Sequence, residues 1–287
     1  MSSHTQTKTT FSVDTIPAMP IVAAKIMKLL SNTDVSVQDI ANVISIDQAI
    51  AAKVLQVANS PFYGLARKVQ NIKQAIVIMG LSGIKSIVIA VSTKNVYKHP
   101  GLLENLLWEH SVGSGMAAFL IAKHTKKVLS DDAFIGGLLH DIGKPIMHNL
   151  QRDQFHKLMQ TSYNENFTIT QYLEAEKEMF GITHMDIGAM AIKKWQLSKD
   201  ILLATQTHHV LEPQESRQGG NLFFWACVTL ANLFCHHLGI GMRDKDQSVN
   251  LENCLPTAVL SLPPSDVEIL LEQTQTSFEE EMSSFTF

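Results

Sequence analysis

The chain has 287 residues, 45% of them hydrophobic, and its 23 lysines and arginines against 27 acidic residues give a net charge of −4. This length and composition predict one large or two smaller domains with a sizeable core. Because there is no basic block and no arginine/glycine-rich tract, we expect no direct binding of nucleic acid. The three cysteines lack a CxxC spacing, which argues against a disulfide framework or a cysteine zinc site and fits a reducing compartment.

Two features bear on localisation. Residues 1–15 are polar, without the apolar core of a signal peptide, and predict a disordered N-terminus. The longest apolar run, from about Ile76 to Val91, is interrupted by Lys85 and falls short of the ~20 residues of a membrane span. We therefore expect a soluble, cytoplasmic protein without a membrane segment.

Helix signals dominate the first third of the chain. Ser36 and Asp39 fit a capping box that opens a helix, and the helix after it must end before Pro61, because a residue that precedes proline avoids helical geometry. Gly80 is expected to close the next helix. The β-branched run "SIVIAV" that follows is interpreted as helix, since no second strand with turn residues accompanies it. These signals predict an N-terminal helical subdomain over residues 16–96.

After the polar break "STKNVYKHPG", the second half also predicts helices. An HD-like bundle is expected over residues 102–240, followed by a C-terminal extension, residues 241–287, whose last helix starts near Ser265 with proline and capping signals. The predicted fold is therefore all-α. No glycine-rich phosphate loop, GxSxG or Rossmann fingerprint is present. The expected helices of the bundle are Leu103–Lys127, Asp131–His148, Asp153–Asn164, Thr170–Phe180, Met185–Trp195, Lys199–Val210 and Leu222–Leu238.

Twelve histidines are many for this length, and several lie on or beside apolar helix faces of the second half. Any one of them alone would usually be a hydrogen-bonded core or surface residue. As a set with one aspartate they offer the nitrogen and oxygen ligands that suit iron, manganese, nickel or zinc, and Asp141 could bridge two such ions. A bound ion would also offset the cost of burying polar groups in an apolar wall. The sequence therefore predicts a site for one or two divalent transition ions at His110, His140, Asp141, His184, His208 and His209.

The order of these residues, a histidine, then "HDIGK", then a histidine, then "HH", resembles the HD superfamily of metal-dependent phosphohydrolases. Four longer stretches, "IPAMPIVAAKIMKLL", "ISIDQAIAAKVLQVANSPFYG", "NIKQAIVIMGLSGIKSIVI" and "THMDIGAMAIKKWQLSKDILLATQTHH", resemble its HDOD branch, the HD-related output domain of bacterial signal transduction. The resemblance covers about residues 16–238. It implies an N-terminal helical bundle packed on an HD-like bundle, a role in signalling output, and a metal-ligand role for the six residues named above.

The sequence departs from the catalytic members of the superfamily at two points. Asn232 stands where those members have a final aspartate ligand, and no Gly-Tyr-Pro element follows the paired histidines. A neutral amide is a weaker ligand, so we expect metal binding to survive better than turnover. Lys144 could contact a substrate phosphate or be a solvated side chain, and both readings stay open. His236 and His237 lie near a helix end and are not assigned to the site.

Two functions remain open at this point. The first is a regulatory module that binds a signalling protein or a nucleotide, with a structural or vestigial metal. The second is a metal-dependent phosphohydrolase acting on a phosphodiester or a nucleotide. The intact His-Asp pair favours the enzyme, whereas Asn232, the missing Gly-Tyr-Pro element and the HDOD resemblance favour the regulatory module. The sequence predicts no oligomeric state.

Overall fold

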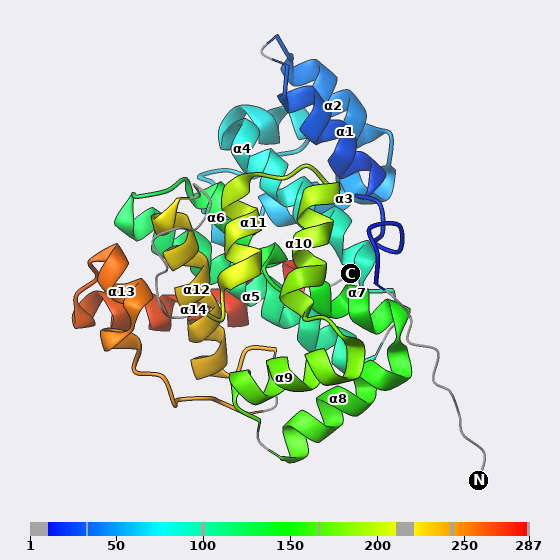
Figure 1. Cartoon of the computed structure of the whole chain (residues 1–287). Coiled ribbons are helices and arrows are strands. Elements are labelled where there is room, and N and C mark those ends of the chain that lie inside the picture. Colours follow the sequence, from blue (N-terminus) through cyan, green and yellow to red (C-terminus); the bar gives the residue numbers. More distant parts are fainter. Residues whose placement is uncertain are drawn as a thin grey trace.

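The computed structural model describes residues 11–32, 34–98, 101–165, 167–210, 221–241 and 244–285. Throughout these ranges the regular elements are helices and no strand occurs, which confirms the all-α prediction. Figure 1 shows α1 and α2 at one end of the molecule, and α8 and α9 side by side at the other. Disorder is predicted for residues 1–15, and the first ten of these lie outside the described residues. Residues 11–15 are described, and the Phe11 ring packs against Phe180.

The N-terminal helices follow the local signals. The capping box of Ser36 and Asp39 is present at the start of α2, and α3 ends before Pro61. Gly80, at φ +76°, breaks the helical geometry inside α4 as predicted, although the helix resumes directly after it and includes the β-branched run. The elements are α1 (Ile21–Leu30), α2 (Val37–Ser45), α3 (Gln48–Ala58), η1 (Pro61–Tyr63), α4 (Ile72–Thr93) and η2 (Lys94–Val96).

The second half contains one departure from the predicted helices. The expected helix over residues 131–148 is two helices, because the chain turns between Leu139 and Gly143. A side chain at position 143 would collide with the carbonyl oxygen of His184, so the turn lets α7 approach the start of α10. The elements are α5 (Leu102–Thr125), α6 (Ser130–Leu139), α7 (Gly143–Leu150), α8 (Arg152–Asn164), α9 (Ile169–Phe180), α10 (His184–Lys194), α11 (Lys199–Thr207) and α12 (Leu222–Leu238).

The C-terminal part packs back onto both halves. The predicted last helix is α14 (Pro264–Phe285), which lies along α5 and reaches η1. The indole Nε1 of Trp108 donates a hydrogen bond to the carbonyl oxygen of Phe285 at 2.9 Å. Two short elements that the sequence did not predict precede it, η3 (Leu251–Asn253) and α13 (Leu255–Leu260). One buried apolar cluster extends across the break at residues 97–101, and a division into subdomains at that break stays a prediction.

One segment among the described residues, Ile72–Val96, is long and apolar enough to cross a membrane, with a mean hydropathy of 2.1 over its best window. This apolar segment is therefore longer than the sequence predicted, because the helix continues through Lys85. In the structure 61% of that window is buried, as in the core helix of a soluble protein. The pair α2 and α3 meets the same test only as two helices bent by 118°. The helix therefore serves the core of this fold.

Candidate metal centre

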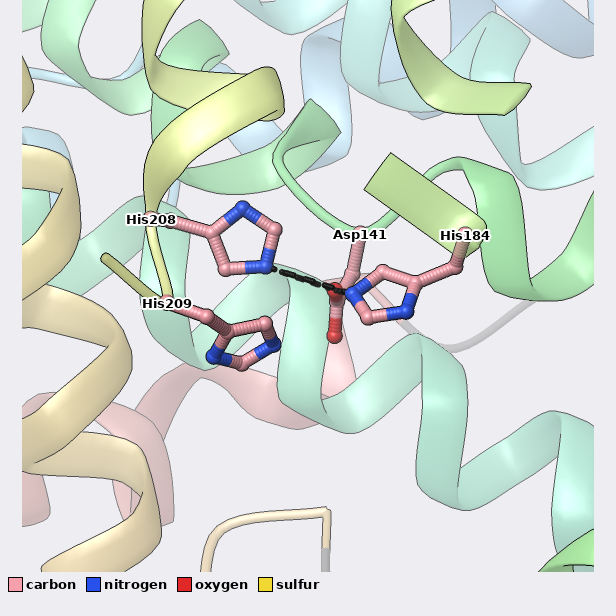
Figure 2. A group of neighbouring side chains, drawn as sticks. All are labelled: Asp141, His184, His208 and His209. Carbon is pink, nitrogen blue, oxygen red and sulfur yellow. Dashed lines mark hydrogen bonds and ion pairs between the residues drawn. The ribbon is translucent and has the colours of Figure 1, made fainter. Parts of the chain in front are cut away.

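The Asp141 carboxylate lies at the centre of the predicted site. Its Oδ1 is 3.2 Å from Nε2 of His184 and 3.2 Å from Nε2 of His208. Its Oδ2 is 3.7 Å from Nε2 of His110 and 3.5 Å from Nε2 of His140. Figure 2 shows the imidazoles of His184, His208 and His209 gathered around the carboxylate. The structure thus brings all six predicted residues together, in two groups that share Asp141, and within each group the ligand atoms lie within 4.8 Å of one another.

Helix ends place most of these side chains. His140 and Asp141 lie in the turn between α6 and α7, His184 is the first residue of α10, and the paired histidines follow the last turn of α11. His110 alone comes from the middle of a helix, α5. The start of α10 is fixed by a capping box in which Asp186 accepts hydrogen bonds from the hydroxyl and the backbone amide of Thr183. The positions of five of the six predicted ligands therefore depend on where helices begin or end.

Backbone carbonyls fix the orientation of three imidazoles. The Nδ1–H groups of His110, His140 and His208 donate to the carbonyl oxygens of Ile240, Gly137 and Thr205 at 3.2, 2.6 and 3.1 Å. In a neutral ring the Nε2 atom is then an acceptor, and it points toward the carboxylate. Nε2 of His140 and Oδ1 of Asp141 are buried and have no hydrogen-bond partner. Buried acceptors such as these two, which face one another without a donor, fit a cation, so the residues present suit a divalent metal.

Glu176 orients His184 from the side remote from Asp141. One of its carboxylate oxygens, Oε2, accepts hydrogen bonds from Nδ1 of His184 at 2.8 Å and from the His184 backbone amide at 2.9 Å. Burial lowers the pKa of His184, but the carboxylates of Glu176 and Asp141 together outweigh it and the net shift is upward. A carboxylate behind a ligand histidine is the usual support of a metal site. Glu176 was not predicted from the sequence, although it lies four residues from both Tyr172 and Phe180 on the buried face of α9.

Lys144 pairs with Asp141. Its Nζ atom is 2.5 Å from Oδ2, and only 13% of its side chain is exposed, so its reading as a solvated lysine is wrong. Burial raises the pKa of Asp141, but Lys144 together with His140, His184 and His208 outweighs it and holds the pKa well below the ordinary value. The carboxylate is therefore ionised at neutral pH and able to bind a cation. The reading of Lys144 as a phosphate contact stays a prediction.

Asn232, on α12, completes the group around His110. Its side chain is buried, and its Oδ1 is 3.0 Å from Nε2 of His110. Burial lowers the pKa of His110 to about 4, so this ring is neutral at pH 7. His236 lies one turn after Asn232, and its ring centroid is 5.3 Å from that of His110. His236 thus lies beside a predicted ligand, but it belongs to neither of the two groups around Asp141, and its place outside the site stays a prediction.

His209 is the most loosely held of the six. Its ring centroid is 4.1 Å from that of His208 and 5.2 Å from that of His184. Burial, together with His208, His184 and Lys144, lowers its pKa well below the ordinary value. Its Nε2 has no hydrogen-bond partner. A neutral imidazole with a free nitrogen beside two others is a suitable metal ligand.

Two solved structures share this architecture. An HDOD domain protein of unknown function from Geobacter sulfurreducens superposes with a TM-score of 0.76 at 25% identity, covering 94% of this chain and 92% of that one. A presumed phosphohydrolase from Shewanella amazonensis SB2B superposes with a TM-score of 0.73 at 20% identity, covering 95% of each chain. At 20% identity, the likeness to the Shewanella protein shows the fold alone.

Sequence comparison identifies the family. An uncharacterized protein from Treponema pallidum (strain Nichols) is 27% identical over 200 residues, which are 69% of this chain, and the chain spans 38% of the length of that relative. The model of the HDOD domain matches residues 16–211, which include all six predicted metal-site residues and the turn between α6 and α7. Sequence match, fold and site order agree, and the chain belongs to the HDOD family.

Proposed function

We propose that this chain is a bacterial signalling module whose centre around Asp141 binds a divalent transition metal, and that the module acts by binding and not by turnover. The main support for a bound metal is that unpartnered acceptor atoms converge on the Asp141 carboxylate. The HDOD family supports the signalling role. The partner is a separate signalling protein or a nucleotide, in the cytoplasm, without direct contact to nucleic acid or membrane.

The six residues would hold the ion or ions, and Asp141 would be shared between two positions. Such an ion supplies Lewis-acid chemistry when bound. Asn232 limits that chemistry, because it offers a neutral amide beside His110 where a carboxylate would add negative charge. A metal position with fewer anionic ligands binds its ion more weakly. We therefore expect little hydrolysis of cyclic dinucleotides or simple phosphodiesters at neutral pH.

Metal analysis of the purified full chain tests the proposal. The native protein should contain at least one equivalent of a transition ion per chain, and Asp141→Ala should contain almost none. Asp153→Ala is the matched control, because Asp153 is exposed on α8 and contacts none of the six residues. Equal metal content in native protein and Asp141→Ala would contradict a metal centre at this position.

A metal-dependent phosphohydrolase is the second candidate, favoured by the convergence of all six ligand residues. A side-by-side phosphodiesterase assay of the native chain and Asn232→Asp, with manganese or ferrous iron in excess, separates the two functions. The signalling proposal expects negligible rates for the native protein. Rapid metal-dependent turnover by the native protein would make the enzyme the correct function.

A further inference from the structure

A cavity lies away from the metal centre. It has a volume of about 530 Å³ and opens where α1 and α4 of the N-terminal half meet the first residues of α6, α11 and α12. Cavities of this size hold small-molecule ligands. None of the six metal-site residues lines it. Its apolar wall includes Ile89, Val128, Ile135, Ile201 and Phe224.

Positive charge collects at this cavity. Lys85, Lys126 and Lys127 line it, together with Asp132 and Asp200. The two acids are already engaged: Asp132 pairs with Lys85 at 2.5 Å, and Asp200 accepts a hydrogen bond from a backbone amide at 2.7 Å. The Nζ atom of Lys127 makes two long contacts, 3.4 Å each, to a carbonyl and a hydroxyl oxygen, and lies 4.6 Å from the centroid of the Phe223 ring, so it has no ion pair among the described residues. Lys126 has no side-chain hydrogen bond or ion pair to any other described residue. Two ammonium groups are thus available to an anion.

Three helix N-termini add positive electrostatic potential at this cavity. Leu129, Ser198 and Asn221 immediately precede α6, α11 and α12, and all three line the cavity. The N-terminal end of a helix carries partial positive charge, which favours phosphate. The side chains of Ser198 and Asn221 cap the first amides of α11 and α12, whereas the start of α6 has no side-chain cap. Lysine ammonium groups and helix N-termini together suit a phosphate, with room for an apolar or aromatic body against the wall.

The backbone conformation of Lys126 also supports an anion site at this cavity. Lys126 ends α5 in the left-handed region, with φ +55°, where glycine is the preferred residue and a side chain costs free energy. A lysine at such a position keeps a long cationic side chain at the cavity despite this cost. The geometry therefore offers a variant, Lys126→Gly, that removes the ammonium group without harming the fold.

We propose that this cavity binds a phosphorylated small molecule, with the phosphate at Lys126 and Lys127 and the body against Val128 and Phe224. The same three helices that begin at the cavity carry residues of the metal centre at or beyond their other ends: His140 and Asp141 after α6, His208 and His209 after α11, and Asn232 within α12. A ligand here would contact the opposite ends of the helices that position the metal centre.

Calorimetric titration of the full chain with pyrophosphate tests the proposal, after removal of metal so that phosphate cannot bind through an ion. The native protein should bind pyrophosphate. Lys126→Gly should weaken binding by about tenfold or more, as expected for the loss of one charged contact, while its melting temperature stays equal or rises. Lys123→Ala is the matched control, because Lys123 lies on α5 outside the cavity, and it should bind like the native chain.

Two further variants make the outcome decisive. Lys127→Ala should also weaken binding, whereas Asp141→Ala, which alters only the metal centre, should leave it unchanged. Absence of pyrophosphate binding by the native chain would overturn the proposal. So would native affinity in both Lys126→Gly and Lys127→Ala, or loss of binding in Asp141→Ala, which would place the anion at the metal centre.

Discussion

At the scale of single residues, the site depends on one carboxylate shared among four imidazoles. Asp141 is 3% exposed and His140 is fully buried, so neither can rely on water. Within the protein alone, Lys144 supplies the only close positive charge that the structure describes beside this carboxylate. Burying so many acceptors is costly unless a cation compensates them. This imbalance is the physical reason to expect a metal ion here.

The carboxylate behind His184 can be tested directly. Glu176→Gln keeps the shape and an acceptor but removes the charge that raises the basicity of His184. We expect metal affinity to fall by about tenfold or more, as for other supporting carboxylates, with the helical circular-dichroism spectrum unchanged. Metal titration with a competing chelator measures the change. Glu174→Gln, exposed on the same helix, is the control, and equal affinities in the two variants would contradict the role of Glu176.

Asn232 offers the opposite test, a gain. Asn232→Asp adds a negative charge 3.0 Å from Nε2 of His110 without changing the size of the side chain. With metal present we expect higher metal occupancy and a measurable phosphodiesterase rate, because an anionic ligand strengthens the binding of the ion on that side. Without metal the added buried carboxylate should lower the melting temperature. Metal content and thermal unfolding with and without chelator measure both effects, and a variant with unchanged metal content would contradict the role given to Asn232.

The six residues that meet at Asp141 were predictable because each stands in a recognisable local motif. Glu176 was not, since it acts through a neighbour in space and carries no motif of its own. It reaches His184 across the turn between α9 and α10. The partner of Lys144 was also beyond the sequence, because pairing with Asp141 depends on how tightly the α6–α7 turn closes.

At the scale of elements, the break between α6 and α7 decides the site. The apolar pattern continues through residues 131–148, so periodicity predicted one helix. The structure ends α6 at Leu139 because a tertiary contact, between Gly143 and the first residue of α10, requires the chain to turn. Local signals placed the capping box of α2 and the break at Gly80 correctly. A contact between distant helices leaves no such local signal.

The contact at Gly143 gives a prediction at this scale. A methyl group at this position would collide with the carbonyl oxygen of His184 and would push α7 away from α10. We expect Gly143→Ala to lower the free energy of unfolding by about 2–4 kcal/mol, in the range of overpacked cores. It should also lower metal content, since Asp141 and His184 lie on the two sides of the contact. Urea unfolding and metal analysis measure the two effects, and a variant with native stability would contradict the tight approach.

At the scale of the whole molecule, the metal centre draws on more of the chain than the family match. The HDOD match ends at residue 211, yet Asn232 and the carbonyl of Ile240 contact His110 from beyond it. Fold class was predictable because helical periodicity recurs along the chain and capping residues mark several of the helix starts. The short elements η3 and α13 were not predicted, because six residues or fewer leave too little periodicity to detect.

Acid should destabilise the metal-free protein as a whole. Burial lowers the pKa of His110 to about 4 and that of His140 to about 3, against about 6.5 in an unfolded chain. As the pH falls below 6.5 the unfolded chain takes up protons that the folded chain refuses, so stability is present above pH 6.5 and is lost toward pH 4. His184, whose pKa is raised, opposes this only in part. We expect urea unfolding in the presence of chelator to show a loss of about 3 kcal/mol between pH 7 and pH 5. Saturating metal at pH 7 should raise stability further, because the ion binds only the folded chain. A flat pH profile without metal would show that these imidazoles are not held neutral in the folded protein.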